Sequence, residues 1–142
     1  IIARTMTAYL DIQRQFKFHQ GHKKYVAYLC KPHTKDKSGT ISLPLRPDIN
    51  DRPRQLVDYI NGKEAITEYQ FTTDRRVELY PQTGRTHQLR MHCAHSNGLA
   101  NPIMGDELYG TKDKRLYLHA EEITFIHPTT KKEVTFFHKA DF

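Results

Sequence analysis

Short segments with the residue pattern of β-strands recur along most of this chain, and they constrain its fold more than any other feature. Residues 23–30, 65–73 and 75–80 alternate between side chains for the two faces of a sheet. Further strand-like segments cover residues 40–45, 116–120, 122–126 and 133–138. Because the junction between residues 73 and 75 is short enough for a hairpin, the sequence predicts a mainly antiparallel sheet.

Two other segments have the three- and four-residue spacing of amphipathic helices. The first covers residues 5–19 with Thr5 as its N-cap, and the second covers residues 87–96 with Thr86 as its cap. Gly98 lies where a helix ends in the left-handed conformation. The predicted fold class is therefore α+β, with a mainly antiparallel mixed sheet flanked by helices.

The length of the chain fits one domain over residues 1–142. Its 22 Lys and Arg residues outnumber 16 Asp and Glu, and the resulting net charge of +6 favours a polyanionic partner such as RNA. An ordinary basic protein has the same balance, so charge alone does not decide. Residues 46–54 contain proline and several charges, which predicts an extended surface loop.

Cysteine usage and hydropathy bear on the compartment. Cys30 and Cys93 have neither the paired spacing of a zinc site nor a secreted disulfide pattern, so a reducing cytoplasm fits best. The sequence has no apolar run long enough for a membrane span and no secretory leader. We expect a cytoplasmic protein without a membrane partner.

The stretch over residues 81–92 is the densest candidate for chemistry, because a glycine turn leads into a helix N-terminus there. Its polar side chains are Arg85, His87, Gln88 and Arg90. Such donors suit phosphates, a base edge or a carboxylate. A solvated helix start with a structural arginine is the alternative.

The sequence Pro-Gln-Thr-Gly-Arg-Thr-His-Gln-Leu-Arg at residues 81–90 closely resembles a signature of the RluA-type pseudouridine synthases. Further matches follow in the same order at residues 101–106, 109–110, 115–120 and 127–128, and residues 13–16 and 23–27 resemble the helix and strand after the family's active-site loop. The resemblance covers nearly the whole chain. It implies the C-terminal portion of the pseudouridine synthase catalytic domain, which is an RNA-modifying isomerase.

In that family the nucleophile is an Asp in a His-Arg-Leu-Asp segment followed by Thr-Ser-Gly, and this chain has no such segment. Asp11 follows Leu10, but it lacks both flanking motifs and lies in a predicted helix, so we reject it. The resemblance places the nucleophile directly before Ile1, which is not a natural start residue. We therefore expect the 142-residue chain alone to be inactive.

The resemblance also implies three catalytic residues. Arg90 corresponds to the arginine that pairs with the nucleophile, so its carboxylate partner is expected to be absent from this chain. Tyr25 matches a tyrosine that stacks on the uracil and serves as a base late in the reaction, and Leu118 matches an apolar residue beneath it. Without the resemblance, Tyr25 and Leu118 would pass as ordinary core residues.

The residues expected to hold RNA combine the helix start with two further basic segments. Residues 51–55 (Asp-Arg-Pro-Arg-Gln) are similar to a stiff loop of the RluA subgroup that acts on both ribosomal RNA and tRNA, and a solvated charged loop is the alternative. The full set is Lys23, Lys24, Arg52, Arg54, Arg85, His87 and Gln88.

Neither a metal nor a cofactor is predicted. His87, His92 and His95 lie close together in sequence, but no further ligands at zinc-site spacing accompany them, and no nucleotide-binding motif occurs.

We prefer the hypothesis that the full-length protein is a monomeric, cofactor-independent pseudouridine synthase acting on structured rRNA or tRNA. The mechanism implied by the resemblance flips out a uridine, cleaves its glycosidic bond, rotates the retained uracil and rejoins it through C5. A non-catalytic RNA-binding module is the alternative. A basic structural domain with chance motif matches is a third.

Overall fold

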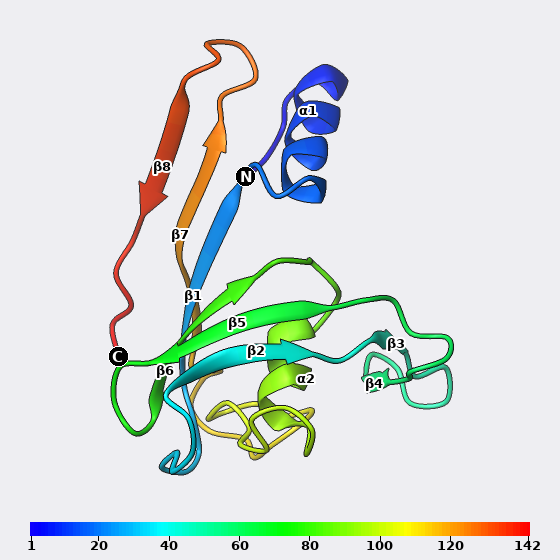
Figure 1. Ribbon diagram of the computed structural model, residues 1–142, viewed down its shortest axis with the longest axis vertical. Coiled ribbons are helices and arrows are strands. Elements are labelled where there is room, and N and C mark those ends of the chain that lie inside the picture. Colours follow the sequence, from blue (N-terminus) through cyan, green and yellow to red (C-terminus); the bar gives the residue numbers. More distant parts are fainter.

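A six-stranded sheet is the frame of the structure, a computed structural model that describes residues 1–142 (Figure 1). The elements along the chain are α1 (Met6–Lys17), β1 (His22–Tyr28), β2 (Ser38–Ser42), β3 (Leu45–Pro47), β4 (Gln55–Val57), β5 (Ile66–Phe71), β6 (Arg76–Pro81), α2 (Gln88–Ala94), β7 (Leu118–Ile126) and β8 (Glu133–Phe137). The strand order is β2-β5-β6-β1-β7-β8, and every pairing is antiparallel. Strands β3 and β4 form a separate antiparallel hairpin.

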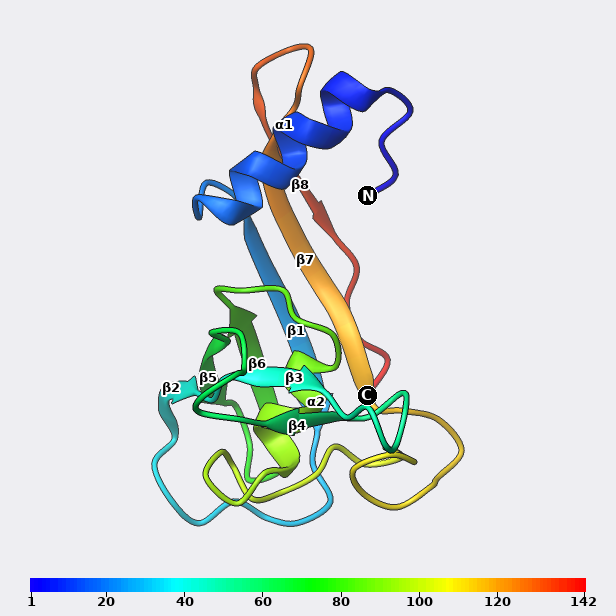
Figure 2. The same ribbon diagram turned by 90° about the vertical axis from the view of Figure 1, so that its right-hand side faces the viewer.

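The two helices lie beside different halves of the molecule (Figure 2). Strands β1 and β7 run through both halves, with α1 beside their upper ends, whereas α2 lies near β5 and β6 in the lower half (Figures 1 and 2). Neither helix is long and apolar enough to cross a bilayer.

Helix α1 is held to the sheet by a polar side chain. Thr5 caps the helix, because its hydroxyl accepts the amide of Ala8 at 3.2 Å. Gln15, the one buried residue of the helix, accepts the amide of Ile126 at 2.7 Å and donates to its carbonyl at 2.8 Å. These two bonds give α1 a fixed position at the end of β7.

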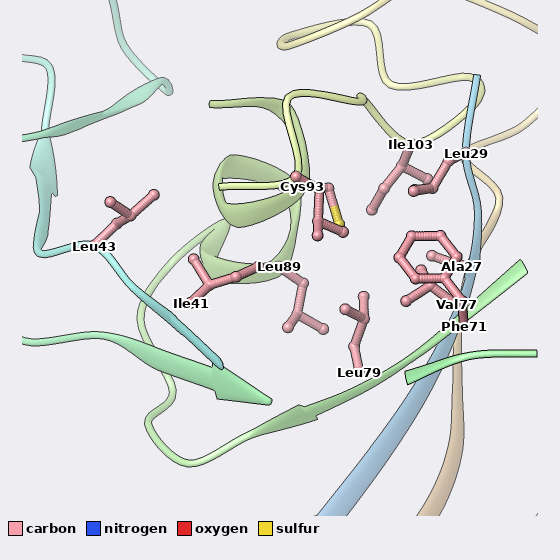
Figure 3. Packing of buried hydrophobic residues seen from close by; sticks show 11 residues of the cluster. Ala27, Leu29, Ile41, Leu43, Phe71, Val77, Leu79, Leu89, Cys93 and Ile103 are labelled. Atoms are coloured by element: carbon pink, nitrogen blue, oxygen red, sulfur yellow. The ribbon is translucent and has the colours of Figure 1, made fainter. Parts of the chain in front are cut away.

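The main core lies between α2 and one face of the sheet (Figure 3). A helix turns about 100° per residue, so Leu89 and Cys93 share the face of α2 that points toward the sheet. There they join a cluster with the inward side chains of β1 and β6. Its buried members are Ala27, Leu29, Ile41, Leu43, Phe71, Val77, Leu79, Leu89, Cys93, Leu99 and Ile103. This packing fixes which way the other sides of α2 face.

Most predicted elements are confirmed, including the first helix, the α+β class and the hairpin of β5 and β6. Two predictions about strands need correction. Residues 48–54 form the predicted surface loop, but residues 46 and 47 belong to β3, which pairs with β4 across that loop. The two segments predicted over residues 116–126 form one continuous strand, β7, with a β-bulge opposite residues 24 and 25.

The ends of α2 also differ from prediction. His87, not Thr86, occupies the N-cap position, and it does so in the left-handed conformation with φ of 52° and without a side-chain cap. At the other end, Ala100 has the positive φ of 50° that was expected of Gly98. Gly98 is needed for space instead, since a Cβ there would lie 2.0 Å from the carbonyl oxygen of His92.

Candidate active site

A buried ion pair between α2 and the loop after it is the most constrained feature of the site. The Nε and Nη2 atoms of Arg90 donate to the two carboxylate oxygens of Asp106 at 2.9 and 2.6 Å. The Asp106 side chain has no solvent exposure, and the Arg90 side chain is 18% exposed. Two parallel bonds of this kind hold a guanidinium in a fixed plane. Nη1 is the nitrogen of Arg90 left without a partner in the chain.

The backbone around Asp106 is built to place its carboxylate. Gly105 has a φ of +79°, which favours glycine, and Asp106 Oδ1 accepts the amides of Leu108 and Tyr109 at 3.0 and 3.1 Å. Burial opposes ionisation, but the hydrogen bonds from Arg90 and these amides outweigh it, so the pKa of Asp106 lies below its usual value. Asp106 is therefore an anion at neutral pH.

Arg90 does have a carboxylate partner within this chain, Asp106, which the sequence analysis did not expect. The pairing of Arg90 with a nucleophilic carboxylate that the chain lacks stays a prediction. Asp106 is not a substitute nucleophile, since its side chain is fully buried and both oxygens are already bonded. In the sequence, Asp106 drew attention only as the last residue of the motif over residues 101–106. Its position directly after a glycine in that motif was the one sequence feature that could have marked it as a site residue.

The other two predicted catalytic residues lie on neighbouring strands. Tyr25 in β1 pairs with Ala120 in β7, and Leu118 pairs with Ala27, so Tyr25 and Leu118 share the inner face of the sheet. Both are half-buried and pack against the main core. Burial raises the pKa of Tyr25, so its hydroxyl keeps its proton at neutral pH. The catalytic roles of these residues stay predictions.

A tyrosine that the sequence reasoning missed joins the helix start to the β3–β4 hairpin. The Tyr109 hydroxyl accepts the backbone amide of Gln55 and lies 2.8 Å from His87 Nδ1. The ring of Tyr109 also faces the Arg90 guanidinium, whose Cζ is 5.3 Å from the ring centroid. The His87 side chain is thus tied to the same assembly as Arg90.

Two predicted RNA-binding residues have structural partners. Gln88 is 4% exposed and bonds the Thr83 hydroxyl, the amide of Arg85, and the carbonyl of Ile66. The Nε atom of Arg85 donates to the backbone of Glu64 at 2.8 Å, but the residue remains exposed. Gln88 therefore shapes the loop at residues 81–87, and Arg85 is displayed by it.

A cleft of about 1000 Å³ lies between the end of α1, the start of β1 and the loop after β6. Basic side chains along its walls are Arg14, Lys17, His19, His22, Lys23 and Arg85, and two acidic residues, Glu64 and Glu68, also line it. The Nζ atom of Lys23 lies 4.4 Å from the ring centroid of Phe16, and burial lowers the pKa of Lys23. Lys23 and Arg85 thus line the same cleft, and their contact with RNA stays a prediction.

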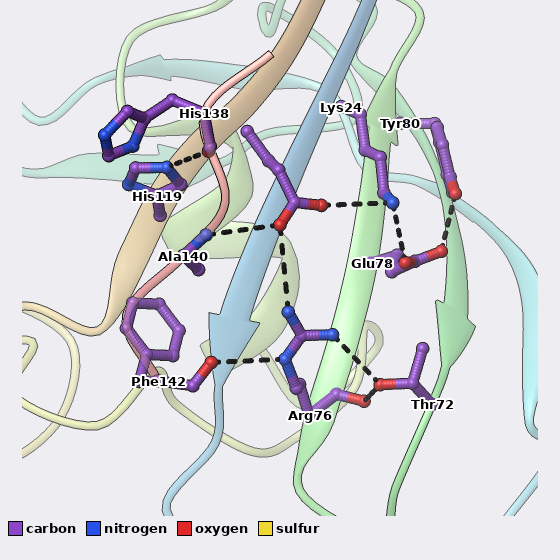
Figure 4. A network of polar contacts seen from close by, with 10 residues as sticks. Lys24, Thr72, Arg76, Glu78, Tyr80, His119, His138, Ala140 and Phe142 are labelled. Carbon is purple, nitrogen blue, oxygen red and sulfur yellow. Dashed lines mark hydrogen bonds and ion pairs between the residues drawn. The ribbon is translucent and has the colours of Figure 1, made fainter.

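Lys24 lies on the opposite face of the sheet, in a network that includes the C-terminal segment (Figure 4). Its Nζ atom is 2.7 Å from Glu78 and 3.1 Å from Glu121. Burial opposes ionisation of both carboxyls, but Lys24 outweighs it and leaves their pKa values below the usual range. The stability they contribute is therefore present at neutral pH and is lost as the pH falls through those lowered values.

The β3–β4 hairpin displays the other two predicted RNA-binding residues. Arg52 is exposed in the turn, and Arg54 forms a partly exposed ion pair with Asp51 at 3.4 Å. At the base of the hairpin, the Nε atom of Arg46 donates to Asp58 at 2.6 Å and, with backbone amides, lowers the pKa of Asp58 to about 2. The predicted basic loop is thus the connection between the two strands of the β3–β4 hairpin.

The histidines considered for metal binding are engaged separately. The His92 ring bonds the Thr67 hydroxyl and the carbonyl of Leu43, whereas His87 bonds Tyr109. No group of three or more potential ligands gathers anywhere in the structure.

Comparisons with known proteins agree with this architecture. A family profile described as RNA pseudouridylate synthase matches residues 1–95. The dual-specificity RNA pseudouridine synthase RluA of Haemophilus influenzae is 37% identical and that of Escherichia coli 40% identical, in alignments that span all of this chain and 68% of each relative. Human RNA pseudouridylate synthase domain containing 1 superposes with a TM-score of 0.76 at 29% identity, covering 99% of this chain and 63% of the human one.

The fold and these likenesses define the class of the protein as an RNA pseudouridine synthase, which is an isomerase. Within that class the chain belongs to the RNA pseudouridylate synthase family and is similar to the RluA enzymes. It spans about two thirds of the length of these relatives.

Proposed function

We propose that the complete protein isomerises uridine to pseudouridine in structured RNA, using a nucleophilic carboxylate that this chain does not contain. The observation that carries the proposal is the fixed guanidinium of Arg90. With Nε and Nη2 bound to Asp106, Nη1 is left to hold a second carboxylate. A cation in that place keeps a nearby Asp ionised and orients its carboxylate toward the uridine.

Tyr25 and Leu118 complete the proposed pocket on the sheet face that the α2 core packs against. In the family mechanism the uracil of a flipped uridine stacks on the tyrosine, is released from C1′, rotates and rejoins through C5. Because burial keeps Tyr25 protonated at neutral pH, stacking is the role that its present environment favours. Release of tritium from C5-labelled uridine in rRNA or tRNA by the complete protein tests the proposal, and no release from either RNA would defeat it.

The curated relatives are named dual-specificity enzymes. We further propose rRNA and tRNA as the substrates, a cytoplasmic location and a monomeric enzyme without metal or cofactor, as expected from the sequence. The basic cleft and the exposed turn of the β3–β4 hairpin support an RNA partner, because phosphates are held chiefly by Lys and Arg. A non-catalytic RNA-binding module is the outcome if RNA binds but no tritium is released.

The adjacent lysines of β1 allow a matched test of the RNA surface. Lys23→Met should weaken RNA binding and reduce the slope of log affinity against log salt by about 0.7 to 0.9, the effect of one lost phosphate contact. Lys24→Met should leave that slope unchanged but destabilise the fold by about 2 kcal/mol, because Glu78 and Glu121 lose their nearest cation. Filter binding over a salt series and thermal unfolding measure the two effects. A reversed pattern would show that RNA lies on the other face.

A further inference from the structure

We propose that Tyr109 is a positioning residue that fixes the β3–β4 hairpin against the start of α2, so that the hairpin's basic turn and Arg90 act on one RNA. The inference deepens the proposed function and rests on it. Tyr109 lies outside the set of residues predicted to bind RNA or to take part in the chemistry. Its position between three parts of the site is what assigns it a role.

The hydroxyl of Tyr109 connects two backbone segments that are far apart in sequence. It accepts the amide of Gln55, the first residue of β4, and it lies 2.8 Å from Nδ1 of His87, at the N-terminus of α2. A phenol that accepts from an amide still has its own proton to donate. The Tyr109 hydroxyl donates to His87 when Nδ1 of the imidazole carries no proton.

The state of His87 fits this direction of donation. Burial, followed by the charge of Arg90, lowers the pKa of His87, while Asp106 acts in the opposite sense. At neutral pH the imidazole is thus uncharged and its Nδ1 can accept. Loss of the Tyr109 hydroxyl would remove a bond that favours the neutral ring, so the pKa of His87 would rise.

The ring of Tyr109 has two sets of neighbours. It faces Arg90, and it packs against a small buried cluster of Leu45, Ala65 and Met91. Leu45 belongs to β3 and Met91 to α2, so this cluster is where the hairpin meets the helix. Ring and hydroxyl together anchor the hairpin to the helix that carries Arg90.

A second tyrosine, Tyr59, follows β4 by two residues and serves as the control. Nδ2 of Asn97 donates to the Tyr59 hydroxyl at 3.1 Å, and Tyr59 is 66% exposed. An exposed bond of this kind contributes little to positioning, because water replaces it readily. Tyr59 contacts neither Arg90 nor His87 by any hydrogen bond in the structure.

Tyr109→Phe in the complete protein removes the hydroxyl and keeps the ring over Arg90. We expect the KM for RNA to rise about fivefold, the effect of one lost hydrogen bond on positioning, with kcat within about twofold. Hydrogen exchange at the Gln55 amide should accelerate and the NMR-measured pKa of His87 should rise. Tyr59→Phe should match the wild type in all four quantities.

Unchanged Gln55 exchange and unchanged KM in Tyr109→Phe would overturn the inference, as would equal effects in Tyr59→Phe. Hydrogen exchange at Gln55 and the titration of His87 need no turnover, so they test whether Tyr109 fixes the hairpin even if the wild-type protein releases no tritium. A wild-type protein that releases no tritium would count against the proposed function alone. A fall in kcat with unchanged KM would also contradict the inference, because it would place the hydroxyl in the chemistry.

Discussion

Arg90→Met in the complete protein should abolish detectable tritium release while leaving RNA affinity within a few-fold of wild type. The guanidinium is held by Asp106 with Nη1 free, so its loss removes the cation that is proposed to orient the nucleophile. The same substitution should destabilise the fold by about 3 kcal/mol, because it leaves the Asp106 carboxylate buried beside two amides without a counter-charge.

A double-mutant cycle separates the catalytic effect from the structural one. Asp106→Asn keeps an acceptor for the amides of Leu108 and Tyr109 but weakens the pair with Arg90. In Arg90→Met with Asp106→Asn, much of the lost stability should return, since no buried charge remains, whereas activity should stay absent. Recovery of turnover in the double variant, measured with thermal unfolding as the stability control, would contradict the catalytic role of Arg90.

Gly105→Ala should be the most damaging of the glycine substitutions in the site. Its φ of +79° disfavours a side chain, and the new Cβ would lie 1.7 Å from the carbonyl oxygen of Arg115. The backbone must move to relieve this contact, and Asp106 is the next residue, so the pair with Arg90 should be disturbed. We expect a loss of about 3 kcal/mol or more in unfolding free energy, with a large loss of activity.

Gly84 offers a matched control in the same site. It precedes Arg85 in the loop before α2, has no positive φ, and no atom would lie within 4 Å of a new Cβ. Gly84→Ala should therefore unfold within about 0.5 kcal/mol of wild type. Equal unfolding midpoints for Gly105→Ala and Gly84→Ala would show that the loop accommodates the clash and does not depend on its glycine.

Local patterns were sufficient to predict the elements whose signals lie within a few residues. Thr5 and the apolar spacing after it gave α1, and alternation gave β5 and β6. The join between two predicted strands in β7 was missed because the bulge opposite residues 24 and 25 breaks the alternation. The β3–β4 hairpin was missed because its strands are three residues each, too short for a periodic signal.

Site residues that belong to a sequence motif could be predicted. The interactions that those residues make could not, because they depend on tertiary contacts. Arg90 was identified by its motif, but its partner Asp106 depends on how the loop folds back onto α2. Alternation already places Lys23 and Lys24 on opposite faces of the sheet, but only the tertiary fold shows that Glu78 and Glu121 engage Lys24 while Lys23 lines the cleft. Gln88 was predicted to bind RNA because its hydrogen-bond partners could not be seen in the local sequence. They come from β5 and from the loop before α2, which only the tertiary fold brings next to it.

The central claim is that Arg90 serves a carboxylate supplied from outside these 142 residues. The most direct measurement compares tritium release from C5-labelled uridine RNA by the complete protein and by the 142-residue chain, side by side, with folding of each verified by circular dichroism. We predict release by the complete protein and none by the chain alone. Turnover by the 142-residue chain would contradict the claim, because the nucleophile would then have to lie among the residues described here.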